Sequence, residues 1–285
     1  MQIGIFGLHR GSSADPEVLV RRARRAEELG FESVWVGDHI ALPVSGSEVG
    51  DNMPHQARLE ALMALSFVAA VTRRVRLAVG VIVLPQRQPV LLAKQLSTLD
   101  VLSNGRLIVG FGVGYVDAEL RALGASLHDR AARTDEYLEV MRALWSSSAE
   151  ATSFSGRFVE LNGVVQRPLP VQVPYPPVIF GGQSTAAYRR TVQLGDGWYG
   201  FDLDVSATAS ALEELRAATS RFGRPAERPP LEITITPPAG PVSLETAQRY
   251  AQLGVDRLAV QPRRMDGSAI DDLMASLAET LIGQV

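Results

Sequence analysis

Apolar residues along this chain fall into short continuous runs separated by segments of helical periodicity. The run from Val75 to Leu84 is rich in valine, leucine and isoleucine and has the length of a strand. Because its apolar residues are consecutive and not alternating, it is typical of a strand buried on both faces of a parallel sheet. The same reasoning predicts further strands at Ile3 to Leu8, Phe31 to Gly37, Arg106 to Gly112, Pro177 to Gly181, Gly197 to Phe201, Leu231 to Thr236 and Asp256 to Val260.

Helical segments with recognisable ends lie between these runs. Asp15 as N-cap and Pro16 at the first helical position predict a helix that stops at Gly30. Pro89 opens another, and its end in Ser103 to Gly105 is typical of a left-handed helix terminus. Further helices are predicted around Leu59 to Ala69, Arg133 to Trp145, Thr185 to Leu194, Ser206 to Phe222, Ser243 to Leu253 and Ile270 to Ile282.

A strand is thus followed by a helix eight times. This alternation predicts a parallel sheet with right-handed crossovers, and eight units is the number that closes a (β/α)8 TIM barrel. We therefore expect an α/β fold in which residues 1–285 form a single TIM-barrel domain. A doubly wound open sheet is the structural alternative.

Two segments depart from the alternation. Ser153 to Pro177 holds short strand-like pieces and five prolines. We interpret residues 153–177 as an insertion that lies over one end of the fold, and not as a linker between domains. A polar loop rich in glycine and serine is expected from Ile40 to Gln56.

Composition excludes several classes of function. The chain has no cysteine, which excludes disulfides, thiolate metal sites and cysteine nucleophiles. A formal net charge of −3 gives no indication of a nucleic-acid or membrane partner. The basic run Arg21 to Arg25 is predicted to be a solvated patch on the first helix. Neither a signal-peptide pattern nor an apolar run of membrane-spanning length is found, so a cytoplasmic protein with a small-molecule partner is expected.

Glycine is frequent where the predicted strands end, and the chemistry of a TIM barrel lies at those C-terminal ends. Gly80 interrupts the run Val75 to Leu84, GFGVGY spans Gly110 to Tyr115, and GGQS joins a strand to a helix at Gly181 to Ser184. Glycine-rich turns before a helix allow the backbone to approach a phosphate. The alternative is that these glycines serve only turns and tight packing. Their number favours a flat ligand lying against backbone.

Asp38 and His39 form an acid–imidazole pair at the end of the second strand. Such a pair can hydrogen-bond a heterocycle and exchange a proton near neutral pH. In the alternative, Asp38 caps the following loop and His39 is merely exposed. His9, His55 and His128 are predicted to be solvated. The spacing of histidines matches no metal site, so no metal is expected.

Several longer motifs carry a resemblance to the luciferase-like monooxygenase superfamily, and especially to its branch of F420-dependent oxidoreductases. Together they cover nearly the whole chain. They are AEELGFESVWVGDH (Ala26 to His39), RLAVGV (Arg76 to Val81), PVLLAKQLSTLDVLSNGR (Pro89 to Arg106), VGFGVG (Val109 to Gly114), RTDEYLEVMRALW (Arg133 to Trp145), PPVIFGG (Pro176 to Gly182) and LGDGW (Leu194 to Trp198).

This resemblance implies a TIM-type barrel with a lid-like insertion and a flavin or deazaflavin at its C-terminal mouth. It implies a cis non-prolyl bulge at Gly80-Val81 that backs the cofactor ring, and a homodimer. The cofactor-binding residues implied by the matching motifs are Asp38, His39, Gly80, Val81, Val113, Gly114, Gly181, Gly182, Gln183 and Ser184. Tyr115 stands where glucose-6-phosphate-oxidising members carry a glutamate, which leaves the substrate open.

Three functions follow as hypotheses. The leading one is an F420-dependent oxidoreductase that transfers a hydride between the deazaflavin and a small organic substrate. There, His39 is the candidate proton donor or acceptor and Tyr115 a candidate substrate contact. The second is an FMN-dependent luciferase-like monooxygenase. The third is a barrel that binds a flavin or deazaflavin without turnover.

Overall fold

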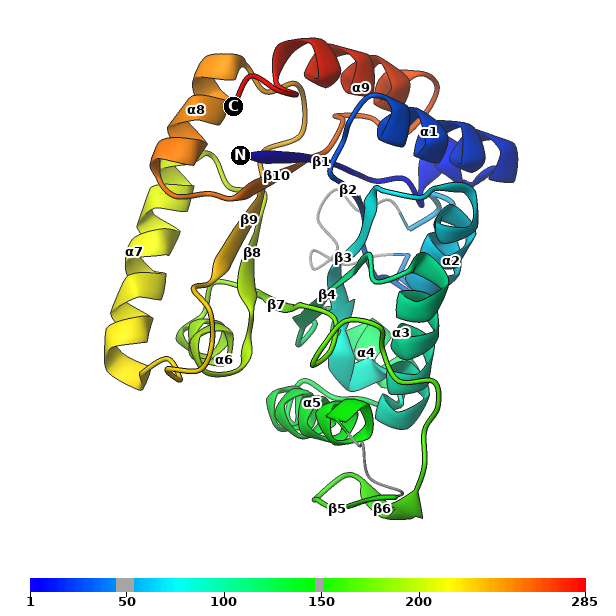
Figure 1. Ribbon diagram of the computed structural model, residues 1–285, viewed down its shortest axis with the longest axis vertical. Helices are drawn as coiled ribbons and strands as arrows, with labels where there is room; N and C mark the ends of the chain where they lie inside the picture. Colours follow the sequence, from blue (N-terminus) through cyan, green and yellow to red (C-terminus); the bar gives the residue numbers. More distant parts are fainter. Residues whose placement is uncertain (45–53, 147–150) are drawn as a thin grey trace.

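Eight parallel strands close into a barrel in the computed structural model, which describes residues 1–44, 54–146 and 151–285 (Figure 1). The central part of the predicted loop Ile40 to Gln56 lies outside the described residues. The predicted TIM barrel is therefore confirmed. Around the barrel, the strands are β1 (Gln2–Phe6), β10 (Arg257–Val260), β9 (Glu232–Thr236), β8 (Gly197–Phe201), β7 (Val178–Gly181), β4 (Leu107–Gly112), β3 (Arg76–Val83) and β2 (Ser33–Val36).

Helices surround this barrel on its outside (Figure 1). None of the described helices combines the length and apolar content needed to cross a bilayer. In chain order, the helices are α1 (Pro16–Glu28), α2 (Ala61–Val71), α3 (Pro89–Ser103), α4 (Asp117–Ala122), α5 (Arg130–Ser146), α6 (Thr185–Leu194), α7 (Val205–Phe222), α8 (Leu244–Gln252) and α9 (Ala269–Thr280), with short 3-10 helices η1 (Gly11–Ala14) and η3 (Leu84–Gln86).

The helix ends follow the local signals in the sequence. The Asp15 carboxylate accepts hydrogen bonds from the amides of Glu17 and Val18, so it caps α1 as expected. Asn104 ends α3 in the left-handed region, with φ of 57°. One detail of α1 corrects an expectation. Arg22, predicted to be solvated, is buried and forms a 2.7 Å ion pair with Asp271 of α9.

The barrel interior is closed at the N-terminal ends of its strands. Arg257, fully buried at the start of β10, pairs with Glu32 at 2.7 Å and with Glu232. Next to this cluster, the rings of Trp35 and Tyr199 stack with centroids 5.3 Å apart and an interplanar angle of 7°. These side chains fill the barrel interior below the pocket, which opens at the C-terminal ends of the strands.

The third strand carries the predicted bulge. Between Val79 and Ile82 the register with β4 shifts by one residue, because three steps along β3 match only two along β4. The peptide bond between Gly80 and Val81 is cis, as the resemblance implied. The bulge leaves both residues partly exposed while the rest of β3 beyond Arg76 is buried.

The insertion does not lie where a lid would. It forms an antiparallel hairpin, β5 (Thr152–Ser155) and β6 (Glu160–Val164), which lies beside α5 on the outside of the barrel (Figure 1). The Glu136 carboxylate of α5 accepts hydrogen bonds from the backbone amides of residues 157 to 159 at the hairpin turn.

The rest of this segment reaches the N-terminal ends of the strands. The amides of Val171 and Gln172 donate to Asp100 near the end of α3, and the Gln172 side chain donates to the carbonyl of Leu107 at the start of β4. The implied lid-like position is therefore wrong. The segment joins a helix to the following strand, and such connections lie opposite the strand ends that carry a TIM-barrel site.

Candidate functional site

A pocket of about 440 Å³ opens at the C-terminal end of the barrel. Its volume lies within the range usual for small-molecule and cofactor sites. The strand ends bring together these predicted residues in its lining: Asp38, His39, Gly80, Val81, Val113, Gly114, Tyr115, Gly181 and Gly182. Gln183 and Ser184 are exposed outside this lining, where the Ser184 hydroxyl caps α6 by accepting from the Ala187 amide.

The side chain of Val81 covers glycines on two neighbouring strands. A Cβ added at Gly112 would lie 2.7 Å from Val81 Cγ2, and one at Gly181 would lie 3.1 Å from Val81 Cγ1. These glycines thus make room for Val81, which is partly exposed to the pocket. The pocket wall here is an apolar side chain resting on glycine backbone, and not the bare backbone that glycine frequency suggested.

Gly80 has a different neighbour. A Cβ added there would lie 2.8 Å from Cζ of Tyr199, whose hydroxyl forms a 2.7 Å hydrogen bond with Thr236. Tyr199 is buried and stacks on Trp35, so it has no space to move away. Burial raises the pKa of Tyr199 far above its ordinary value. Its phenol is therefore neutral. The fixed ring supports the bulge at Gly80 from inside the barrel.

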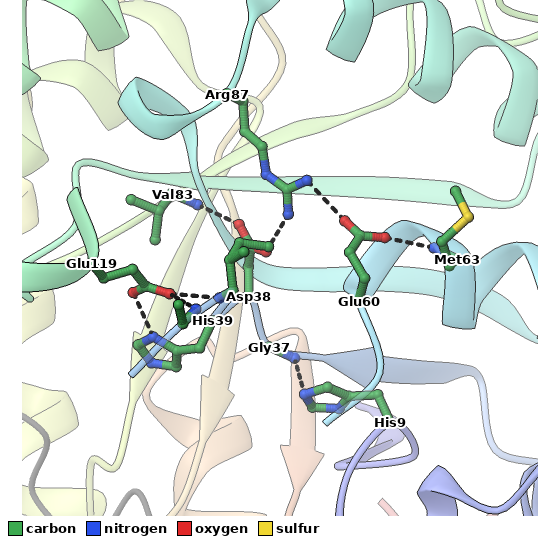
Figure 2. A network of polar contacts seen from close by, with 11 residues as sticks. His9, Gly37, Asp38, His39, Glu60, Met63, Val83, Arg87 and Glu119 are labelled. Atoms are coloured by element: carbon green, nitrogen blue, oxygen red, sulfur yellow. Dashed lines mark hydrogen bonds and ion pairs between the residues drawn. The ribbon is translucent and has the colours of Figure 1, made fainter. Parts of the chain in front are cut away.

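Asp38 ties the end of β3 to the second strand (Figure 2). One carboxylate oxygen accepts from the Val83 amide at 3.0 Å, and the other is bound by the guanidinium of Arg87, which also pairs with Glu60 at 2.8 Å. Burial raises the pKa of Asp38, against the opposing pull of Arg87. Both oxygens are engaged, so Asp38 positions the strand end, while its direct contact with a cofactor stays a prediction.

His39 is held by an acid that sequence reasoning missed. Glu119, on α4, lies 2.9 Å from Nδ1 of His39 and accepts from the amides of Ile40 at 2.5 Å and Ala41 at 3.1 Å (Figure 2). Burial alone would raise the pKa of Glu119, but these hydrogen bonds outweigh it and hold that pKa below its ordinary value. The carboxylate is thus ionised and only accepts, so Nδ1 of His39 donates to it and Nε2 is left for other partners.

His9 is the second residue that the structure adds, and its predicted exposure is wrong. The imidazole is 2% exposed, lines the pocket and accepts at Nε2 from the Gly37 amide at 3.2 Å. Burial, with the nearby charges of Arg10 and Arg58, lowers its pKa to about 3. His9 is therefore neutral, and its proton sits on Nδ1.

The open side of the pocket is aromatic and basic. The ring of Tyr115 meets that of His39 edge-on, with centroids 6.1 Å apart, and is 54% exposed. Arg10, Arg58 and Arg130 also line the pocket, and Arg130 donates to the Gly114 carbonyl at 2.5 Å. Positive charge in the lining contrasts with the net negative charge of the whole chain.

The chain matches the sequence model of the luciferase-like monooxygenases over residues 1–264. An uncharacterized protein of Mycobacterium tuberculosis is 33% identical over 271 residues, which is 90% of this chain and 92% of that protein. The F420-dependent glucose-6-phosphate dehydrogenase of Amycolatopsis mediterranei is 34% identical over 192 residues, 64% of this chain and 53% of the dehydrogenase. The FMNH(2)-dependent dimethylsulfone monooxygenase of Pseudomonas putida is 30% identical over 138 residues, 47% of this chain and 38% of the monooxygenase.

A solved structure agrees with this fold. The F420-dependent secondary alcohol dehydrogenase in complex with an F420-acetone adduct matches with a TM-score of 0.81 at 17% identity, covering 100% of this chain and 99% of the other. At that identity the likeness shows the shared barrel alone. The sequence match over residues 1–264 goes further, because it includes every residue that lines the pocket, from Phe6 to Phe201. The chain belongs to the luciferase-like monooxygenase family.

Proposed function

We propose that this protein is an F420-dependent oxidoreductase that transfers a hydride between the deazaflavin and a small organic substrate. The observation that carries the proposal is the pairing of His39 with Glu119 at the edge of a pocket walled by Val81. When bound, the deazaflavin supplies the carbon that gives or takes the hydride. Moving a hydride to or from an alcohol or carbonyl also moves a proton, and a positioned imidazole serves that need.

The residues present fit a planar ring with an anionic tail. Val81 offers an apolar surface against which a ring can pack, held from behind by the glycines of β4 and β7. The backbone of Gly181 and Gly182 faces the pocket at the start of α6, where helix amides favour a phosphate. Because the Ser184 hydroxyl already caps α6, we propose that Gln183 and Ser184 contribute through their backbone.

In this proposal, His39 exchanges the proton through Nε2. Its Nδ1 donates to Glu119, which fixes the ring and keeps Nε2 unprotonated whenever the imidazole is neutral. Nε2 would take the proton of a substrate hydroxyl while the carbon that bears this hydroxyl loses its hydride to the bound deazaflavin, and in carbonyl reduction Nε2 would return the proton to the oxygen. Tyr115, exposed beside His39, is positioned to contact the substrate.

An FMN-dependent monooxygenase is the second candidate. Its support is the similarity to the FMNH(2)-dependent enzyme of Pseudomonas putida, which covers less of this chain than the similarity to the F420-dependent dehydrogenase. A monooxygenase would use the same pocket, since both cofactors present a planar tricyclic ring. The pocket wall alone does not favour one ring over the other, whereas the His39–Glu119 pair favours hydride transfer with its accompanying proton.

Equilibrium binding to the apo-protein separates the two candidates. F420 and FMN are each titrated and followed by their fluorescence, with Gly112→Ala as a variant in which the wall is disturbed. We expect F420 to bind at least about tenfold more tightly than FMN, and the variant to weaken F420 binding. Tight FMN binding without F420 binding would reverse the choice of cofactor, and binding of neither would remove the proposal.

A further inference from the structure

Two arginines face each other across a short antiparallel contact at the pocket rim. Arg10, just after β1, and Arg58, just before α2, form an isolated bridge. The flanking hydrogen bonds run from the Leu59 amide to the His9 carbonyl at 2.8 Å and from the Gly11 amide to the Ala57 carbonyl at 2.9 Å. Arg10 and Arg58 are therefore a non-hydrogen-bonded pair, in which opposing side chains lie closest and on the same face.

This arrangement places like charges together. Directly opposed like charges destabilise an antiparallel pair. The positive charges act on the groups around them. Burial is the larger cause of the lowered pKa of Arg10, and the charge of Arg58 lowers it further. Burial likewise lowers the pKa of His9 most, and the charges of Arg10 and Arg58 add to this effect. An anion bound between the guanidiniums would remove this repulsion and gain charge-assisted hydrogen bonds.

Asp38 is the one acid in the described pocket lining, and Glu119 lies outside this lining, behind His39; both are already engaged. Asp38 is bound by Arg87 and the Val83 amide, and Glu119 is bound by His39 and two backbone amides. Meanwhile, one donor of Arg10 and one of the neighbouring His9 have no hydrogen-bond partner within residues 1–44, 54–146 and 151–285. These are Nε of Arg10 and Nδ1 of His9, which carries the imidazole proton. Arg10 is otherwise held by the Gln261 side chain at 3.2 Å and lies over the Phe6 ring.

We propose that Arg10 and Arg58, with the Nδ1–H of His9 beside them, form a subsite for an oxyanionic group of the substrate, a carboxylate or a phosphate. The identity of that molecule as substrate rests on the proposed function. The subsite lies at the ends of β1 and β2, whereas the glycines of β4, β7 and the start of α6 lie across the pocket. The substrate class is therefore a small organic acid or phosphate ester.

The test measures ligand binding by isothermal titration of the apo-protein, so it needs no turnover. Benzoate and benzamide are the first probes, since they share shape and differ in charge, and phenyl phosphate separates carboxylate from phosphate recognition. We expect benzoate, phenyl phosphate or both to bind at least about tenfold more tightly than benzamide. Arg10→Gln should abolish this preference and leave benzamide binding unchanged, and Arg10→Lys should retain part of it.

Arg58→Gln is the second variant, and it decides the matter if Arg10→Gln does not fold. Arg264→Gln, at an exposed ion pair with Asp266, is the matched control and should bind every probe like the wild type. Equal binding of both anions and benzamide to the wild type would overturn the proposal, as would an unchanged anion preference in the folded Arg10 or Arg58 variants.

Cofactor titration of the same variants separates this proposal from the proposed function. We expect the affinity for F420 to be unchanged in Arg10→Gln and Arg58→Gln. A loss of F420 affinity without loss of anion preference would assign the arginines to the cofactor and overturn the substrate subsite. If the wild type binds neither F420 nor FMN but still prefers the anionic probes, the subsite stands and the oxidoreductase proposal fails.

Discussion

Val81 on β3 occupies the space that a side chain at Gly112 on β4 would need. A Cβ built on Gly112 would lie 2.7 Å from Cγ2 of Val81. Valine is stiff at its first side-chain torsion and cannot turn away easily. The apolar wall of the pocket thus depends on a glycine in the neighbouring strand, and the two positions are coupled.

Gly112→Ala should therefore destabilise the fold by overpacking, by about 1–3 kcal/mol in the free energy of unfolding. Urea denaturation measures this change. Adding Val81→Ala removes the clashing methyl groups, so the double variant should be more stable than Gly112→Ala alone. If the double variant is less stable than the single one by the full cost of Val81→Ala, the two residues do not compete for space.

Glu119→Ala should cost about 2–3 kcal/mol, because it removes the acceptor of three partly buried hydrogen bonds, from the amides of Ile40 and Ala41 and from Nδ1 of His39. Asp117→Asn on the same helix is the control, since its ion pair with the exposed Arg121 contributes less than about 1 kcal/mol. Chemical denaturation gives both values, and nitrogen NMR of His39 reports its tautomer. An Nδ1 without a proton in the wild type would contradict the assigned hydrogen bond.

His9 should make stability depend on pH in the acid range. Its pKa is lowered from 6.5 to about 3 in the folded chain, so its contribution is fully present above pH 6.5. Below that pH the unfolded chain takes up a proton that the folded chain does not, and stability falls by about 1.4 kcal/mol per pH unit until the folded-state pKa is reached.

Unfolding free energies of the wild type and His9→Gln, compared between about pH 6.5 and 4.5, should show a loss that is about 2 kcal/mol smaller in the variant. Glutamine keeps an acceptor near the Gly37 amide but does not titrate. His128→Gln, at an exposed position, should retain the wild-type slope. Equal slopes in the wild type and His9→Gln would contradict the buried neutral imidazole.

Asp38→Asn should destabilise the chain by about 3 kcal/mol, since it removes the buried charge that faces Arg87. Glu60→Gln affects the more exposed partner of the same guanidinium and should cost less than about 1 kcal/mol. Both are measured by denaturation. A larger loss for Glu60→Gln than for Asp38→Asn would show that Glu60, and not Asp38, anchors Arg87.

Much of this architecture was readable from local sequence signals. Continuous apolar runs gave strands within two residues of the observed ends, and Asp15, Pro16 and Asn104 marked helix ends through interactions with their own neighbours. The glycines at the strand ends followed from residue type and position, and the bulge at Gly80-Val81 followed from the motifs that carry the family resemblance. These features depend on short stretches of chain, which is why a single sequence reveals them.

The partners of the site residues were not readable in this way. Glu119 reaches His39 across 80 residues of sequence, through the short helix α4 that lacks a strong periodic pattern. His9 is buried because its backbone pairs with the segment before α2, and that contact has no local signal. The glycines of β4 were attributed to a ligand, whereas their first role is to accommodate Val81, a packing relation between strands.

A crystal structure of the protein with F420 bound would show directly whether the cofactor ring lies against Val81. We expect the deazaflavin ring to pack against the Val81 side chain, with His39 still bound to Glu119 and open space remaining toward Arg10. A ring bound away from Val81, or one that fills the space between His39 and Arg10 and leaves no room for substrate, would contradict this expectation.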